Sequence, residues 1–282
     1  WHMGGAESLL NISIKRFKNW IPKTLIVTTD QLEKPVREAT KGLPNIELLC
    51  EPEGRNTAPC IVMAMEWLRT RDPDATAVFV PADHWITDTA EYINTMKLAV
   101  DVAEKHKNLV TVGIQPTRAE IGFGYIRSGD IIEKNVYAVD RFVEKPSKEV
   151  AETMVQHPEY LWNAGMFVWT VSTFFHELEK VSNEFVKPFA NYRTALARGE
   201  NGRKELQPDY STTPSISIDY ALLEKSKNVA VLPASNFGWN DLGSFVSLEE
   251  IYPKSEGGVA RAEQVLSIGS MANIIDCPGK TV

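Results

Sequence analysis

The chain has 282 residues, 43% of them hydrophobic and 24% charged, and its formal net charge at pH 7 is −7. This is the composition of an ordinary globular protein, long enough for one large domain or two smaller ones. The negative charge argues against a surface that coats nucleic acid, although a mononucleotide could still bind where local cations neutralise its phosphates. No apolar run approaches the ~18 residues that a membrane helix needs, and we expect no signal peptide.

The cysteines bear on the compartment. Cys50, Cys60 and Cys277 are odd in number and widely spaced, which fits neither a disulfide framework nor a zinc site. We therefore expect reduced thiols and a cytoplasmic protein.

The first part of the chain alternates between short apolar, β-branched runs and segments with helical spacing. Asn56 or Thr57 can cap a helix whose first turn accommodates Pro59, because the N–H that proline lacks is not needed there. The β-α-β-α order predicts an α/β fold with a mixed, mostly parallel sheet and helices on both faces. The spacing predicts strands over residues 24–29, 45–49, 76–80 and 109–114 and helices over residues 60–68 and 90–104.

The pattern changes after Pro116. Residues 122–126 and 136–146 read as antiparallel or mixed strands laid over the sheet, 165–169 and 229–232 as further strands, and 148–156 and 171–198 as helices. Beyond about Glu256 the pattern weakens, and residues 265–275 look like the start of a small β-rich addition. We expect one domain over residues 1–255 and an incomplete β-rich region over 256–282.

Two aspartates follow apolar runs at distant points of the chain. Asp83 comes after Val78–Ala82, and Asp241 lies in Gly-Trp-Asn-Asp-Leu-Gly at 238–243. Carboxylates at strand ends of an α/β sheet lie where such sheets bind ligands, and two that converge would hold a hard cation such as Mg²⁺. Either aspartate could instead cap a turn. His84 fits a structural role better than a metal ligand, because Mg²⁺ prefers oxygen.

Seven segments occur in an order that is typical of one family. Together they resemble the bacterial mannose-1-phosphate guanylyltransferases (GDP-mannose pyrophosphorylases) among the sugar-phosphate nucleotidyltransferases, from about Ser8 to the C-terminus. Any one segment alone would be weak evidence. The segments are Arg-Asn-Thr-Ala-Pro at 55–59, Pro-Ala-Asp-His at 81–84, Gly-Phe-Gly-Tyr-Ile at 122–126, Phe-Val-Glu-Lys-Pro at 142–146, Leu-Trp-Asn-Ala-Gly-Met-Phe at 161–167, Ser-Ile-Asp-Tyr at 217–220 and Trp-Asn-Asp-Leu-Gly at 239–243.

The resemblance implies a Rossmann-like, GT-A-like nucleotidyltransferase fold that ends in a β-helix-like region. It implies transfer of GMP from GTP to mannose 1-phosphate, assisted by Mg²⁺, with GDP-mannose and pyrophosphate as products. The substrate supplies the nucleophile, so catalysis depends on alignment and on neutralising phosphate charge. Neither a nucleic acid nor a membrane is implied as a partner, and a homodimer stays open.

The resemblance also implies roles for individual residues. Asp83, Lys145 and Asp241 would be catalytic, with Asp83 and Asp241 as metal ligands. Each residue also has a plainer interpretation, as a helix cap, a turn residue or a surface ion pair. The nucleotide would contact Arg55, Asn56, Thr57, Ala58 and Asp83, and the sugar phosphate would contact Gly124, Glu144, Lys145, Asn163 and Asp219.

The chain departs from the family in one respect. The family begins with a strand and a loop of the form Gly-Gly-x-Gly-x-Arg that wraps the triphosphate. Here Gly4-Gly5 is not that loop, and Ser8 matches the start of the helix that follows it. We expect either a truncated chain or omitted stretches, with the C-terminal region also cut short. Two rivals therefore stay open: the same fold with another nucleotide and hexose 1-phosphate, and a non-catalytic regulatory paralogue.

Overall fold

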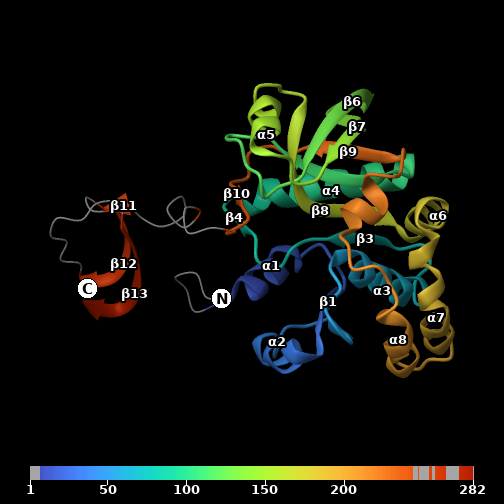
Figure 1. Cartoon of the computed structure of the whole chain (residues 1–282). Coiled ribbons are helices and arrows are strands. Elements are labelled where there is room, and N and C mark those ends of the chain that lie inside the picture. The colour runs from blue at the N-terminus through green and yellow to red at the C-terminus, as the bar shows by residue number, and fades with distance from the viewer. Residues whose placement is uncertain (1–6, 244–246, 248–253, 256–257, 265–272, 282) are drawn as a thin grey trace. The chain divides into compact units, whose positions relative to one another are not determined.

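The computed structural model describes residues 7–243, 247, 254–255, 258–264 and 273–281 (Figure 1). The chain divides into two compact units. The smaller unit contains Trp1–Ile21, Ala82–Thr89 and Phe237–Val282, and the larger contains Pro22–Pro81 and Ala90–Asn236. The expected domain boundary at residue 255 stays a prediction.

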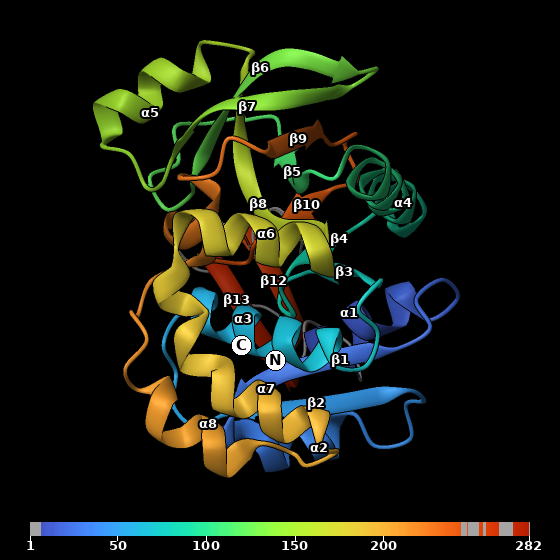
Figure 2. The ribbon, with the colours of Figure 1, turned by 90° about the vertical axis from the view of Figure 1, so that its right-hand side faces the viewer.

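The larger unit contains a parallel pair of strands. β1 (Thr24–Thr29) pairs with β2 (Ile46–Glu51) from Thr24 opposite Ile46 to Thr29 opposite Glu51. In Figure 2 the pair runs between α3 (Thr57–Arg69) and α2 (Glu33–Ala39). β1 has the bounds expected from its β-branched run, and α3 extends the predicted helix by one turn at its start.

A six-stranded sheet forms the rest of the framework in the described residues. Its strand order is β3-β8-β5-β9-β7-β6, and β8 also pairs with β6. The strands β8, β5, β9, β7 and β6 therefore close into a ring, with β3 attached to β8. The bounds are β3 (Thr76–Phe79), β5 (Leu109–Ile114), β6 (Tyr125–Glu133), β7 (Val136–Val143), β8 (Tyr160–Thr170) and β9 (Val229–Pro233).

The mixed α/β class is confirmed, but the expectation of a mostly parallel sheet was wrong for the described strands. Within this sheet only β5 and β9 run parallel, and the pairs β3–β8, β5–β8, β6–β7, β6–β8 and β7–β9 are antiparallel. The physical reason lies in β8, whose second half is buried on both faces. A buried apolar run reads the same in either direction, so the sequence could not show that this strand runs against its neighbours.

Helices cover this sheet and enclose the main core. That core joins buried side chains of α3, β8 and α6 with Phe185, Phe189 and Tyr210. The single helix expected over residues 171–198 was wrong, because the chain breaks at Ser182, which has φ −154° and ψ 53°, and at the turn that contains Pro188. The observed elements are α6 (Val171–Val181), η2 (Asn183–Phe185), η3 (Lys187–Phe189), α7 (Ala190–Ala197) and α8 (Arg203–Tyr210).

Two further helices match their predictions closely. They are α4 (Thr89–His106) and α5 (Lys148–Val155), and α5 lies beside the β6–β7 hairpin in both views (Figures 1 and 2). Among the helices of the described part, none combines the length and apolar character needed to cross a bilayer.

The smaller unit is assembled from distant parts of the chain. α1 (Leu9–Phe17), capped by Ser8, is fastened to the 82–84 segment because Arg16 Nη1 donates to the His84 carbonyl at 3.1 Å. β4 (Trp85–Ile86) pairs antiparallel with β10 (Trp239–Asn240). β11 (Lys254–Ser255), β12 (Gly258–Gln264) and β13 (Asn273–Thr281) form a small sheet, whereas residues 265–272 of the predicted β-rich start lie outside the described residues.

Candidate functional site

Asn163 lies at a bulge in β8. Thr111 of β5 faces Phe167, but Gly113 faces Asn163, so β8 carries extra residues between these two positions. Gly165 within them has φ +65°, a conformation in which a side chain is strained. Bulges of this kind redirect side chains next to sites, and here the bulge brings Asn163 to Asp219.

Hydrogen bonds join Asn163 to two other predicted sugar-site residues. Its Nδ2 donates to Asp219 Oδ1 at 2.7 Å, and its backbone N–H donates to the Gly124 carbonyl at 2.8 Å. Its Oδ1 accepts hydrogen bonds from Thr111 Oγ1 and from the Gly165 backbone N–H, both at 3.2 Å. Hydrogen bonds therefore fix both the carbonyl and the amino end of the Asn163 amide.

Gly124 is needed for close packing. A Cβ at this position would overlap Glu144 Oε2 and would lie 3.2 Å from the Phe142 ring and 3.4 Å from Asn163 Cβ. The resemblance implies that Gly124 contacts the sugar phosphate, and in the described structure the group that lies beside it is the carboxylate of Glu144.

Carboxylates gather around a lysine in this cluster. Burial, with repulsion from Asp219, raises the pKa of Glu144 to about 7, although Lys145 opposes the shift. Lys145 Nζ lies 4.0 Å from Glu144 Oε1. Burial also raises the pKa of Asp219, against hydrogen bonds from Asn163 and Ser217. Such a cluster favours hydroxyl donors and a cation over further negative charge.

Thr111 and Glu224 belong to this cluster, and sequence reasoning missed both. Thr111 is a buried polar residue within the apolar strand Leu109–Ile114, and this contrast was a usable signal. The charge of Glu224 contributes to the raised pKa of Glu144. Glu224 is exposed in the structure, and nothing in the local sequence pattern pointed to its place beside this cluster.

The predicted nucleotide segment forms the start of α3. Asn56 is the N-cap, with φ +64°, and its Oδ1 accepts the Thr57 N–H at 2.8 Å. Arg55 donates twice to the Thr213 carbonyl, at 3.0 Å from Nε and 2.7 Å from Nη2. The capping role predicted for Asn56 is confirmed.

Two of the first N–H groups of α3 already have partners within the chain, so they are not available to a base or an anion. Thr57 N–H is capped by Asn56, and Ala58 N–H donates to the Ile216 carbonyl at 3.1 Å. Thr57 Oγ1 also accepts the Ile218 N–H at 2.9 Å. The segment that leads into Asp219 is therefore bound to the start of α3.

Asp83 and Asp241 both belong to the smaller unit. β4 and β10 pair with Asn240 opposite Trp85, so the two segments that carry these aspartates run side by side. Trp239 Nε1 donates to His84 Nδ1 at 3.0 Å, and burial lowers the pKa of His84 to about 4. His84 is thus a neutral residue that links β4 to β10 through its hydrogen bond with Trp239. This contact is compatible with the structural role expected for His84.

This pair suits a divalent cation. Two carboxylates offer the oxygen ligands that Mg²⁺ prefers. Gly243 leaves room for one of them, because a Cβ there would come within 2.5 Å of Asp241 Oδ2. The donor set and the space beside Asp241 therefore fit the ion that the sequence implied.

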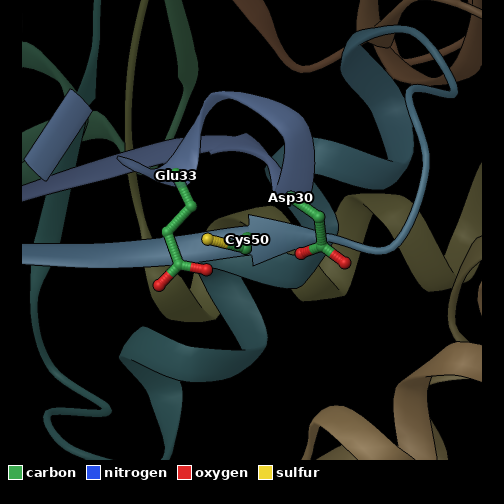
Figure 3. Close-up of side chains that lie close together, drawn as sticks. All are labelled: Asp30, Glu33 and Cys50. Atoms are coloured by element: carbon green, nitrogen blue, oxygen red, sulfur yellow. The ribbon is translucent and has the colours of Figure 1, made fainter. Parts of the chain in front are cut away.

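A second acidic group lies on the β1–β2 side of the larger unit (Figure 3). Asp30, Glu33 and Cys50 place one ligand atom each within 4.8 Å of one another, and among the described residues they form the one group of three that could hold a metal. However, Arg203 pairs with both carboxylates and Arg37 pairs with Glu33 at 2.9 Å. Burial raises the pKa of the Cys50 thiol. We interpret the group as an ion-paired contact between α8 and the η1–α2 segment (η1 is Asp30–Leu32).

The structure describes the side chains of two of the three cysteines. Cys50 and Cys60 are free, and burial raises the pKa of the Cys60 thiol far above neutrality. The side chain of Cys277 lies outside what the structure describes.

Comparison with known proteins identifies the class. The Nucleotidyl transferase family profile matches residues 2–257. The chain belongs to the nucleotidyl transferase family.

Mannose-1-phosphate guanylyltransferases are homologues over most of the chain. The protein of that name from Escherichia coli is 34% identical over 267 residues, which cover 89% of this chain and 56% of the relative. The one from Sinorhizobium fredii (strain NBRC 101917 / NGR234) is 36% identical over 250 residues, which cover 86% of this chain and 48% of the relative. The chain thus spans about half the length of the curated relatives it matches. The resemblance drawn from the seven segments is confirmed.

A solved structure agrees with this assignment. The crystal structure of mannose-1-phosphate geranyltransferase from Thermus thermophilus superimposes with a TM-score of 0.79 at 28% identity. The match covers 92% of this chain and 73% of that one.

Proposed function

We propose that the protein transfers GMP from GTP to mannose 1-phosphate, forming GDP-mannose and pyrophosphate. A phosphate oxygen of the sugar attacks the α-phosphorus of GTP, the bond from that phosphorus to the bridging oxygen breaks, and its electron pair leaves with pyrophosphate. The protein need supply only alignment and charge neutralisation. The observation that carries the proposal is that Gly124, Glu144, Asn163 and Asp219, from separate segments, share one packed cluster in a chain of this family.

On the sugar side, Glu144 would accept hydrogen bonds from sugar hydroxyls, and Asn163 would donate beside it through the second N–H of its amide. Lys145 would neutralise the sugar phosphate, which fits a side chain that is 64% exposed and so free to move toward a ligand. Asp219 would orient Asn163, since their 2.7 Å hydrogen bond fixes the amide.

On the nucleotide side, Arg55, Asn56, Thr57 and Ala58 would bind the guanosine. Because Arg55 and Thr57 already contact the 213–218 segment, we propose that they mainly shape the guanosine site, with Asn56 nearest to the base. Asp83 would contact the nucleotide through the metal site.

Asp83 and Asp241 would hold Mg²⁺. When bound, the ion would neutralise the phosphate charge that develops during transfer. We assign these residues to a catalytic domain over residues 1–255, and the free thiols Cys50 and Cys60 fit a cytoplasmic setting.

The test is pyrophosphate release with GTP, Mg²⁺ and mannose 1-phosphate. Parallel reactions replace GTP with ATP, UTP or dTTP, and mannose 1-phosphate with glucose 1-phosphate. We expect release with GTP and mannose 1-phosphate that stops when a chelator is added and returns with excess Mg²⁺. Release with another pair alone would keep the class and change the substrates, and no release with any pair would favour a regulatory paralogue.

A further inference from the structure

The segment 213–218 runs along the start of α3 and is fastened to it through backbone groups. The Thr213 carbonyl accepts two hydrogen bonds from the Arg55 guanidinium, at 3.0 and 2.7 Å, and the Ile216 carbonyl accepts the Ala58 N–H at 3.1 Å. Two donors on one planar guanidinium fix the direction of a contact as well as its length. The segment is therefore held in one register against the residues that were predicted to bind the nucleotide.

Thr57 makes a further contact with this segment. Its Oγ1 accepts the Ile218 N–H at 2.9 Å. Ile218 is fully buried in the main core, and a buried backbone N–H without an acceptor is costly. Thr57 itself is exposed, so the acceptor for this core residue is a side chain that a ligand can reach.

Ile218 directly precedes the aspartate of the sugar site. Asp219 begins a π-helical turn, Asp219–Leu223, and its Oδ1 accepts the hydrogen bond from Asn163 Nδ2 at 2.7 Å. Asp219 is 8% exposed, so its carboxylate depends on protein groups for its orientation. Two hydrogen bonds and two adjoining residues thus connect the Thr57 hydroxyl to the Asn163 amide.

The Thr57 hydroxyl retains an unused donor. A hydroxyl has one O–H donor and two acceptor lone pairs, and the contact with Ile218 uses a lone pair. Within the part of the chain that the structure describes, no acceptor takes the Thr57 O–H. A ligand oxygen that accepted this proton would make the Thr57 oxygen a stronger acceptor for the Ile218 N–H, because linked hydrogen bonds polarise one another.

We propose that Thr57 is a positioning residue of the sugar-phosphate site, which acts on Asn163 through Ile218 and Asp219. The inference rests on the proposed function, because that function puts the sugar phosphate at Asn163 and the nucleotide at the start of α3. Thr57 thereby has a second task besides contact with the nucleotide. A nucleotide that accepts the Thr57 O–H strengthens the binding of mannose 1-phosphate.

Titration calorimetry with mannose 1-phosphate in the absence of nucleotide tests this role, because Thr57 then has no nucleotide to contact. Thr57→Val keeps the shape of the side chain and removes the acceptor for the Ile218 N–H. We expect Kd for mannose 1-phosphate to rise about fivefold in Thr57→Val and to stay within about twofold in Thr57→Ser, which keeps the hydroxyl. The control Thr194→Val removes an exposed hydroxyl that donates to the Ala190 carbonyl at 2.9 Å within α7, and it should leave Kd unchanged.

The same titration with a bound nucleotide tests the coupling. The probe is a GTP analogue in which a methylene group replaces the oxygen between the α- and β-phosphorus atoms, so that no transfer occurs. In the presence of Mg²⁺ we expect the analogue to lower Kd for mannose 1-phosphate about fivefold in the wild type and less than about twofold in Thr57→Val. An equal effect of the analogue on both proteins would contradict the coupling.

A hydroxyl that only satisfies a buried N–H would change stability without changing sugar affinity. An unchanged Kd in Thr57→Val, measured without nucleotide, would therefore overturn the proposal, as would an equal loss in Thr57→Ser. Circular dichroism checks that each variant is folded. If Thr57→Val does not fold, Arg55→Lys takes its place, because a lysine cannot reproduce the double contact with the Thr213 carbonyl.

A measurement without ligand separates this proposal from the proposed function. NMR of the unliganded protein follows the side-chain amide of Asn163, whose resonances should shift in Thr57→Val and stay in place in Thr194→Val. If the wild type binds neither mannose 1-phosphate nor the GTP analogue, the proposed function fails. Unshifted Asn163 resonances in Thr57→Val would overturn the positioning role whether or not the substrates bind.

Discussion

At the scale of single residues, Glu144 has the most unusual environment in the larger unit. Its side chain is 11% exposed, it packs over Gly124, and other carboxylates repel it. A carboxyl group whose pKa is raised on folding binds a proton more tightly in the folded state than in the unfolded one. The folded protein therefore loses stability as pH rises through the range between the two pKa values.

This gives a pH prediction for Glu144→Gln. Between about pH 4.5 and pH 7, the free energy of unfolding of the wild type should fall relative to that of the variant, because only the wild type must ionise a buried carboxyl. One pKa unit corresponds to about 1.4 kcal/mol, and after allowing for solvent screening we expect a relative change of about 1–3 kcal/mol. Urea unfolding of both proteins at pH 5 and pH 8 measures it, and parallel pH profiles would contradict it.

Lys145→Ala tests the cation of the sugar site. Loss of the ammonium should raise KM for mannose 1-phosphate about tenfold while leaving KM for GTP within about twofold, because the proposed contact is with the sugar phosphate. The matched control is Lys148→Ala, which removes a lysine that is 74% exposed and pairs with Glu152 at 3.9 Å. Equal effects on both substrates would show that Lys145 does not address the sugar phosphate.

The residues that the sequence missed share a physical reason. The motif around Lys145 could be recognised in the sequence because the residues next to Lys145 in the chain belong to the same motif. Thr111 and Glu224 reach the cluster through a bulge in the facing strand and through a π-helix. Neither feature has a spacing that periodicity analysis can detect, since both interrupt the regular period.

At the scale of elements, α3 and α7 are joined through a buried charge. Glu66 is fully buried, and its carboxylate pairs with Arg69 and Arg193, both at 2.7 Å. A buried carboxylate with two guanidinium partners is satisfied, but removing it leaves those partners without their counter-charge.

We predict that Glu66→Ala lowers the free energy of unfolding by about 2–4 kcal/mol, because it leaves a cavity and two partly buried cations. Arg37→Ala serves as the comparison, since the Arg37–Glu33 pair on α2 is largely exposed and should contribute less than about 1 kcal/mol. Chemical denaturation of the two variants measures the difference. Similar losses in both would mean that burial of Glu66 is unimportant.

The prediction of helices and strands succeeded where the local sequence determines the bounds of the element. β1 and β5 have the expected bounds because their β-branched, apolar runs are short and sharply ended. The prediction failed where contacts with distant parts of the chain determine the element. Pro208 lies inside α8, although proline normally argues against a helix, and buried Leu206 and Tyr210 hold that helix against the core.

At the scale of the whole molecule, the two predicted metal ligands come from segments about 158 residues apart. Both belong to the smaller unit, which contains 82–89 and the region from 237 onward. The resemblance predicted this pairing, and the β4–β10 pair joins the two segments that carry the aspartates.

Because Asp83 and Asp241 would serve one ion, their substitutions should not be additive. We expect Asp83→Asn and Asp241→Asn each to lower kcat by about 100-fold or more, and the double variant to be little worse than either. Turnover measured at several Mg²⁺ concentrations tests this, with circular dichroism as the control for folding. If the two losses in kcat multiply in the double variant, or if Asp241→Asn keeps near-normal turnover, the two aspartates do not share an ion.

The strand ring has a consequence for synthesis. β8 pairs with β3, β5 and β6, all of which precede it in the chain, and β9 is needed between β5 and β7 to complete the circle. Strands made early must therefore wait, unpaired on at least one side, until residues 229–233 leave the ribosome. Long-range pairing of this kind slows folding and exposes apolar edges meanwhile. A nascent chain that stalls before β9 should accordingly depend more on chaperones than the finished protein does.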